Sequence, residues 1–134
     1  MLRILVVEDS ASMRSFVRNA LESDSRSSAG VDVVEASSGF EALRLLPRGP
    51  YDLVITDINM PDINGLELIS FIRKSESHKA TPVMIISTQS SERDRARGLS
   101  LGANGYLIKP FSPEVLQTEV WRLLPTGSEA KPHG

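Results

Sequence analysis

The sequence predicts an α/β protein built on a doubly wound, five-stranded parallel sheet. Short apolar runs are spread along the chain, and such runs suit strands that are covered on both faces. Each run is followed by a segment whose apolar residues recur at helical spacing. Strands that alternate with helices form parallel sheets with right-handed crossovers, so the order is a (βα) unit repeated five times. The 134 residues suffice for one domain with a sizeable core.

The predicted strands are bounded by turn-forming or polar residues. A Ser-rich loop at 23–30 precedes the second strand, Pro82 opens the fourth, and Gly102 and Gly105 bracket the turn before the fifth. The third strand is the densest apolar run. In chain order, the strands cover residues 2–7, 31–34, 53–57, 83–87 and 106–108.

The predicted helices begin at polar residues that can cap a helix N-terminus. Such residues precede all but the fourth helix, namely Ser10, Ser38, Asn64 and Ser112. Glu41 and Glu67 stand at capping-box spacing after Ser38 and Asn64, and Pro113 suits the first position of a helix. Pro47 ends the second helix. The fourth helix, within residues 90–101, is weakly apolar and highly charged.

The composition excludes several functions. A net charge of −2 and a pI of about 5.7 give no basic field, so we expect no direct partner among nucleic acids or membranes. The absence of Cys excludes disulfides, thiol catalysis and thiolate metal sites. The longest apolar run is too short to span a membrane. The N-terminus turns acidic at Glu8, where a signal peptide would remain apolar, so a cytoplasmic location is expected.

Four of the five predicted strands end on polar residues. These ends carry Glu8 and Asp9, Asp57, Ser87 and Lys109. Taken singly, each has a structural explanation as a helix cap, a turn residue or a solvated lysine. In a parallel sheet, however, these ends lie at the same edge, where ligands bind in open α/β folds. The sequence therefore predicts one small site with three carboxylates, a hydroxyl and an ammonium.

The chemistry of this set favours phosphoryl transfer. Clustered carboxylates repel one another and favour a hard cation, and Mg²⁺ takes one or two carboxylates together with phosphate oxygens. An Asp carboxylate can itself accept a phosphoryl group. Charge developing on that group would be met by Mg²⁺, by Lys109 and by the Ser87 hydroxyl.

Four motifs give the chain a family resemblance. They read Val-Val-Glu-Asp-Ser, Asp-Ile-Asn-Met-Pro-Asp-Ile-Asn-Gly, Ile-Ile-Ser-Thr and Gly-Tyr-Leu-Ile-Lys-Pro-Phe. In combination they resemble a response-regulator receiver domain, closest to the single-domain chemotaxis type, over residues 2–124. The resemblance implies a flavodoxin-like fold with strand order 2-1-3-4-5, for which the chemotaxis protein is itself a standard example. We therefore expect a receiver domain at 1–124, followed at 125–134 by a flexible tail or the start of a linker.

The resemblance also implies a role for each residue at the sheet edge. Asp57 would be the phosphoacceptor, with Lys109 as the partner of the phosphoryl group. Ser87 would be the switch hydroxyl and Tyr106 the switching aromatic. The expected Mg²⁺ ligands are Glu8, Asp9, Asp57 and the backbone carbonyl of Asn59. The Lys109–Pro110 peptide is expected to be cis, although most X–Pro bonds are trans.

The sequence departs from the family pattern at two adjacent positions. Ser87 stands where Thr is usual, a change that keeps the hydroxyl. Thr88 stands where Ala or Gly is usual, and its larger side chain puts the lifetime of the phosphoryl group in doubt.

These features predict a phosphorylation-activated switch of a two-component phosphorelay rather than an enzyme. Neither His78 nor His133 has ligand spacing, and we expect surface roles for both, so a phosphohistidine donor must be another protein: a histidine kinase or a phosphotransfer protein. The output partner is expected to bind at residues 90–124. A DNA-binding regulator remains an alternative if this chain is a fragment of a longer one.

Two other functions place similar chemistry on similar folds. A haloacid dehalogenase-like phosphatase needs a second Asp two residues after its nucleophile, and Asn59 stands there. A flavodoxin-like electron carrier needs a phosphate-binding loop after the first strand, and the acidic pair Glu8–Asp9 would repel a flavin phosphate.

Several conspicuous side chains are expected to have no catalytic role. Trp121 and Phe111 are predicted to pack rather than to bind a cofactor. The helix that carries Arg93, Arg95 and Arg97 also carries acidic residues, which is typical of a solvated face. Arg14 and Arg18 stand one helical turn apart and could meet a partner, but solvent exposure is the prediction for both.

Overall fold

The predicted five-stranded parallel sheet is confirmed. The structure is a computed structural model, and it describes residues 2–26, 30–88 and 92–124. The strands lie in the order β2-β1-β3-β4-β5, which is the flavodoxin-like order implied by the resemblance. They are β1 (Leu2–Val7), β2 (Val31–Ala36), β3 (Leu53–Asp57), β4 (Val83–Ser87) and β5 (Gly105–Ile108). The expected tail at 125–134 lies outside the described residues.

Helices follow the strands in strict alternation. They are α1 (Ala11–Glu22), α2 (Gly39–Leu45), α3 (Gly65–Lys74), α4 (Glu92–Leu101) and α5 (Pro113–Leu123), and the short 3₁₀ helix η1 (Leu46–Arg48) extends α2. The four predicted N-cap side chains each accept a backbone N–H bond. Asn64 and Glu67 form the predicted capping box. Glu41 instead accepts from the backbone N–H of Ser37, one residue before its expected partner.

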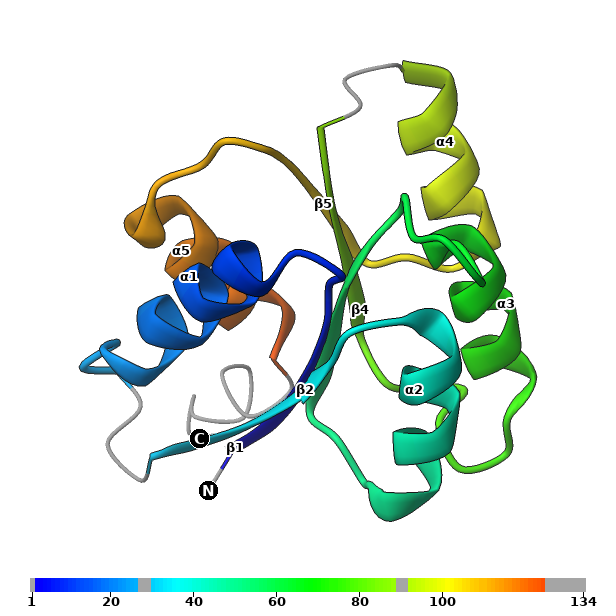
Figure 1. Cartoon of the computed structure of the whole chain (residues 1–134), viewed down its shortest axis with the longest axis horizontal. Coiled ribbons are helices and arrows are strands. Elements are labelled where there is room, and N and C mark those ends of the chain that lie inside the picture. The colour runs from blue at the N-terminus through cyan, green and yellow to red at the C-terminus, as the bar shows by residue number, and fades with distance from the viewer. Residues whose placement is uncertain (1, 27–29, 89–91, 125–134) are drawn as a thin grey trace, which may run out of the picture.

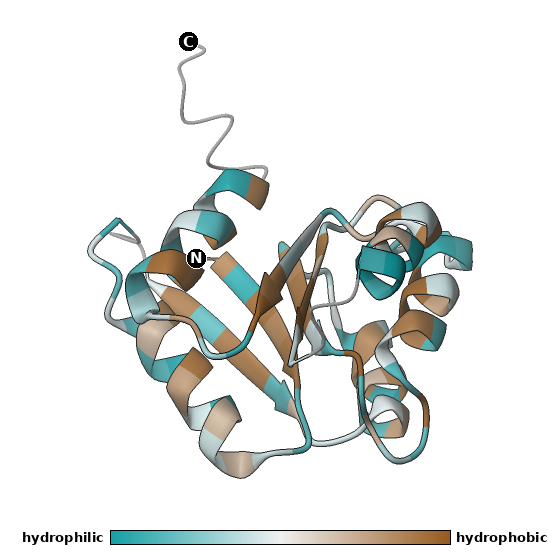
Figure 2. Ribbon diagram, turned by 90° about the horizontal axis from the view of Figure 1, so that it is seen from above, coloured by the Kyte–Doolittle hydropathy of each residue, from teal (hydrophilic) through white to brown (hydrophobic). Residues whose placement is uncertain are grey.

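The helices cover both faces of the sheet. Helices α1 and α5 lie on one face, and α2, α3 and α4 lie on the other (Figure 1). Successive strand residues alternate between the two layers: Ile4 and Val6 pack toward α1 and α5, whereas Leu5 and Val7 pack toward α2 and α3. The apolar strands form the middle layer of the molecule (Figure 2). Both faces of the central strands are thus filled with apolar side chains, and the polar residues Asp57 and Ser87 stand at the ends of β3 and β4.

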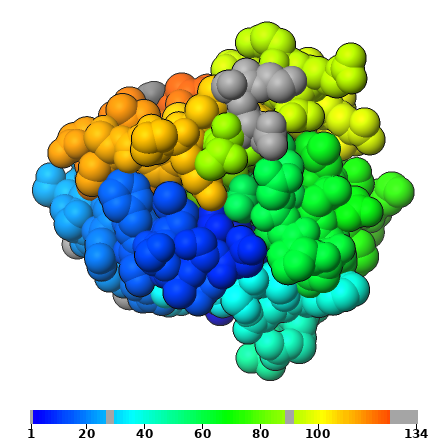
Figure 3. All heavy atoms as spheres, turned by 45° about the horizontal axis from the view of Figure 1, so that its top comes forward, coloured from blue at the N-terminus to red at the C-terminus, as the bar shows by residue number. Residues whose placement is uncertain are grey.

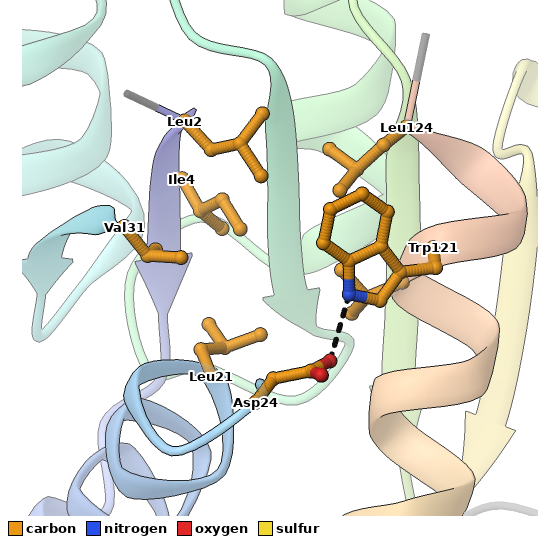
Figure 4. A pocket seen from close by; sticks show the side chains of 8 residues that line it. Leu2, Ile4, Leu21, Asp24, Val31, Trp121 and Leu124 are labelled. Atoms are coloured by element: carbon orange, nitrogen blue, oxygen red, sulfur yellow. Dashed lines mark hydrogen bonds between the residues drawn. The ribbon is translucent and has the colours of Figure 1, made fainter. Parts of the chain in front are cut away.

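Trp121 and Phe111 pack against neighbouring elements, as predicted. Trp121 of α5 lies against the C-terminal end of α1. Its Nε1 donates a 2.7 Å hydrogen bond to Asp24 (Figure 4). The ring of Phe111 lies 5.8 Å from that of Phe16, centroid to centroid. These contacts tie the last turn of α5 to a residue just beyond α1, and the segment just before α5 to the middle of α1.

The surface role predicted for His78 is wrong. Only 6% of this residue is exposed. The turn between α3 and β4 folds against the start of β3, and the imidazole centroid lies 6.2 Å from that of Tyr51. His78 is buried because of this long-range packing. The polar residues around it in the sequence gave no sign of the packing. His133 lies outside the described residues.

The predicted solvent exposure is wrong for Arg14 and only partly right for Arg18, whose side chain is 36% exposed. Both guanidinium groups form ion pairs with Glu35 of β2, and the Arg14 side chain is only 19% exposed. Helix α1 crosses back over the sheet beside β2, which brings these charges together. In contrast, Arg93, Arg95 and Arg97 are exposed, as expected. No helix among the described residues is long and apolar enough to cross a bilayer.

Candidate functional site

Three carboxylates meet at the carboxyl edge of the sheet. Glu8 and Asp9 follow β1, and Asp57 ends the neighbouring strand β3. Each offers one carboxylate oxygen within 4.8 Å of the other two. Glu8 is 1% exposed and Asp57 is 6% exposed, whereas Asp9 is on the surface. In Figure 3, the early blue, central green and late orange parts of the chain meet on this face.

Lys109 joins the two buried carboxylates. Its Nζ lies 2.9 Å from Oε1 of Glu8 and 3.3 Å from Oδ2 of Asp57. Its backbone N–H donates to the carbonyl of Ser87 at 2.8 Å, which continues the pairing of β4 and β5 beyond the strand ends. The Lys109–Pro110 peptide is cis, as the resemblance implied.

The electrostatics follow from burial and pairing. Burial raises the pKa of Glu8, although the hydrogen bond from Lys109 acts in the opposite direction. Burial alone would lower the pKa of Lys109, but the hydrogen bond to Glu8 and the charge of Asp57 outweigh it and leave that pKa raised. One ammonium is thus paired with two of the three clustered carboxyl groups. Their oxygens are hard donors of the kind that Mg²⁺ takes, so the set fits this cation.

Backbone contacts fix the turns that carry these carboxylates. Glu8 accepts a 3.1 Å bond from the N–H of Ser10 through Oε2. Arg14 donates to the backbone carbonyl of Glu8 at 2.8 Å. The N–H of Asn59 donates to Asp57 at 3.4 Å, so the residue expected to supply a backbone ligand lies beside the cluster. The contact made by Arg14 is one that sequence spacing did not indicate.

The loop after β3 is held tightly against Asp57. The N–H of Gly65 donates to the carbonyl of Ile58 at 2.8 Å, and a Cβ at Gly65 would collide with the carbonyl oxygen of Asp57. Only a residue without a side chain fits this close approach.

Asp62 fastens the same loop to α2. Its carboxylate accepts from the N–H of Gly39 at 3.1 Å and of Phe40 at 2.9 Å. The bond from Phe40 is the largest reason why the pKa of Asp62 falls to about 2. In the sequence, Asp62 stands in a turn motif, but nothing there indicates that it binds the N-terminus of α2. The two segments are more than 20 positions apart and become neighbours only when the chain folds.

Ser87 and Tyr106 lie on neighbouring strands beside the cluster. Ser87 is fully buried and Tyr106 is 8% exposed, and the register sets Tyr106 opposite Ile85, two residues before Ser87. Burial raises the pKa of the Tyr106 phenol, and a side-chain hydrogen bond with Ser87 partly offsets this effect. Thr88 follows on the exposed surface. The predicted switch pair is therefore in direct contact.

Comparison with known proteins agrees with this arrangement. The family described as "Response regulator receiver domain" matches residues 4–121. A chemotaxis protein CheY homolog of Campylobacter jejuni is 36% identical over 128 residues, which cover 95% of each chain. Chemotaxis protein CheY1 of Helicobacter pylori is 36% identical over 93% of this chain and 98% of its own.

The fold agrees equally well with a solved structure. Chemotaxis response regulator CheY4 of Vibrio cholerae superposes with a TM-score of 0.83 at 35% identity, over 92% of this chain and 99% of that one. The chain belongs to the response-regulator receiver family and is a CheY-like domain, a phosphorylatable switch of two-component signalling.

Proposed function

We propose that Asp57 accepts a phosphoryl group from a histidine kinase or phosphotransfer protein. The observation that carries this proposal is the position of Asp57, buried at the end of β3 with the Lys109 ammonium 3.3 Å away. An Asp57 oxygen attacks the phosphorus of the donor's phosphohistidine. A P–O bond forms, the P–N bond breaks, and its electron pair returns to the imidazole nitrogen. His78 lies at the opposite edge of the sheet, so it is not the donor.

The chain's own residues prepare the acceptor. Glu8 holds Lys109 beside Asp57, so the ammonium is placed for a phosphoryl oxygen without reorganisation. Glu8, Asp9, Asp57 and the backbone carbonyl of Asn59 would hold Mg²⁺. When bound, this cation neutralises charge on the phosphoryl oxygens. The Ser87 hydroxyl supplies a further hydrogen bond on the side of β4.

We propose that the signal leaves the site through Ser87 and Tyr106. A phosphoryl oxygen competes for the Ser87 hydroxyl, because a charge-assisted bond is stronger than its bond to Tyr106. Tyr106 then repacks, and the surface of residues 90–124 changes shape. An output protein that prefers this shape shifts the population toward it. As the sequence predicts, this switch would act in the cytoplasm, as a receiver domain spanning residues 1–124.

A phosphatase of the haloacid dehalogenase type is disfavoured by Asn59. This residue lies beside Asp57, where such an enzyme needs a carboxylic acid to protonate its leaving group. An amide cannot donate that proton. The site therefore supports acceptance of a phosphoryl group rather than rapid turnover of a phosphate ester.

Phosphorylation with a small donor tests the proposal. With acetyl phosphate and Mg²⁺, the intact mass should rise by one phosphoryl group. Asp57→Asn should abolish the gain, and Asp32→Asn, which alters an exposed residue of β2, should retain it. Undiminished labelling of Asp57→Asn, or labelling in EDTA without divalent metal, contradicts the assignment.

A further inference from the structure

A second concave surface lies between α2 and α3, away from the acidic cluster. It is a hollow of about 200 Å³ whose apolar lining includes Leu43, Leu46, Pro47 and Phe71, and His78 lines it as well. We call this surface the α2–α3 groove. The two helices that form it lie side by side on one face of the sheet (Figure 1).

The α2–α3 groove lies at the opposite edge of the sheet from Asp57. Its residues come from the C-terminal ends of α2 and α3, from η1 and from the turn that precedes β4. In a parallel sheet, these segments gather where the strands begin, whereas the carboxylates gather where the strands end. A ligand in the groove would therefore not touch the phosphoacceptor.

Phe71 lines the groove but is not buried in the core. Helix α3 buries Leu68, Ile69 and Ile72 against the sheet, yet the Phe71 side of the helix faces outward. Phe71 is 52% exposed, and the neighbouring Pro47 is exposed as well. Aromatic side chains of this kind that wall a hollow serve as anchors for a partner's apolar side chains.

His78 closes the groove on the side of the turn that precedes β4. It is buried, and its Nδ1 has no hydrogen-bond partner among the described residues.

The rim of the groove is basic. Arg44, Arg48 and Lys74 stand on the last turns of the helices that flank it, and all three are exposed. In the described part of the chain, Arg48 and Lys74 form no ion pair, and Arg44 approaches Glu41 only at 3.4 Å. The exposed Glu76 is paired with Lys79. The field over the groove thus favours an acidic ligand.

We propose that the α2–α3 groove docks an acidic peptide segment of a partner protein. An apolar side chain of the peptide sits between Pro47 and Phe71, and its carboxylates face Arg48 and Lys74. A concave, apolar-lined surface suits an inserted side chain. Docking here is independent of phosphorylation, so the groove is a tether separate from the output surface at residues 90–124.

Selection from a random dodecapeptide library displayed on phage tests this site. The wild-type chain is the bait, and the Phe71→Ala chain removes peptides that bind elsewhere. Enriched peptides should share acidic residues around an apolar anchor, and a synthetic copy should shift the amide signals of residues 43–48 and 71–79. No enrichment, or enriched peptides without acidic residues, overturns the proposal.

Matched variants then locate the contact. Phe71→Ala and Lys74→Glu should weaken the selected peptide by about tenfold or more, since buried anchors dominate such interfaces. Phe40→Ala and Arg97→Glu alter exposed residues outside the groove and should change the affinity for the peptide by less than about twofold. Addition of beryllofluoride with Mg²⁺ to the parent should also change this affinity by less than about twofold. Equal weakening by the control variants, or a tenfold response to beryllofluoride, contradicts the proposal.

Two further measurements test whether a membrane or a second copy of the chain occupies the groove instead. Binding of phosphatidylglycerol vesicles that is lost in Phe71→Ala would assign the groove to a membrane. Dimerisation that is lost in this variant would assign it to a second copy. Either result overturns the peptide assignment. Asp57→Asn should bind the peptide as the parent does, so a failure of the phosphorylation proposal and a failure of this one are distinguishable.

Discussion

Lys109 donates a 2.9 Å hydrogen bond to Glu8, 101 positions earlier in the chain. The bond joins the residue after the last strand of the sheet to the residue after the first strand of the sequence. Because Nζ of Lys109 also lies 3.3 Å from Asp57, a single ammonium serves two buried carboxylates. This contact is the basis of the first prediction.

Lys109→Met should lower the free energy of unfolding by about 2 kcal/mol in EDTA, because Glu8 stays buried without its ammonium partner. Urea denaturation measures the change. Lys74→Met, at an exposed lysine, should stay within about 0.5 kcal/mol of the parent. Equal stability of Lys109→Met and the parent would show that this ammonium does not hold the cluster together.

Ser87→Ala should uncouple the site from the Tyr106 surface. Beryllofluoride with Mg²⁺ mimics the phosphoryl group, and in the parent it should perturb the amide signals of Tyr106 and of α4. Without the hydroxyl, these changes should shrink to less than half, although the ligand still binds at Asp57. A variant that responds as fully as the parent would exclude the hydroxyl as the relay.

Thr88→Ala should leave the lifetime of the phosphoform unchanged or shorten it. Asn59 lies beside Asp57 and Thr88 adds bulk beside Ser87, so attacking water would have less room to reach the phosphoryl group. Loss of label after removal of acetyl phosphate gives the half-life. A clearly longer half-life in Thr88→Ala contradicts the crowding argument.

Glu35 should contribute to stability in a pH-dependent way. The hydrogen bond from Arg18 is the largest reason why the pKa of Glu35 lies below 4.5, its value without such partners. A lowered carboxyl pKa stabilises the fold above that value, and the contribution is lost as the pH falls through the folded pKa. Glu35→Gln should cost about 1 kcal/mol at pH 7, since the ion pairs are partly solvated.

Urea denaturation from pH 7 to pH 3 checks this expectation. The stability gap between the parent and Glu35→Gln should narrow as the pH falls below 4.5. Glu22→Gln, at an exposed partner of Arg18, serves as the matched control and should give a smaller gap. A gap that stays constant across this range would show that the charge of Glu35 is not the stabilising feature.

Gly65→Ala should damage both the fold and the site. The new Cβ would collide with the backbone carbonyl of Asp57, which cannot move aside as a side chain can. We expect a loss of about 2 kcal/mol in stability and slower labelling by acetyl phosphate. Gly98→Ala is the control, because its Cβ would meet the side-chain ends of Ile85 and Leu66 rather than backbone atoms. If both substitutions lower the stability and the labelling rate equally, the close approach of Gly65 to the backbone of Asp57 is not the reason.

The sequence by itself determined the order of the elements and the composition of the site. Apolar runs and helical spacing are local patterns, and capping residues such as Ser10 and Asn64 act on the turn that follows them. Parallel pairing then brings the strand ends to one edge. For this reason Glu8, Asp57 and Lys109 could be placed together before any distance was known.

Only the tertiary structure decided which distant groups became partners. Glu35 meets Arg14 because α1 crosses beside β2, and Asp62 meets the first turn of α2 because the loop after β3 folds toward it. The burial of His78 and the groove beside Phe71 likewise depend on how two turns and two helices pack. These contacts join segments whose separation in sequence carries no periodic signal, so they arise only when the layers close around the sheet.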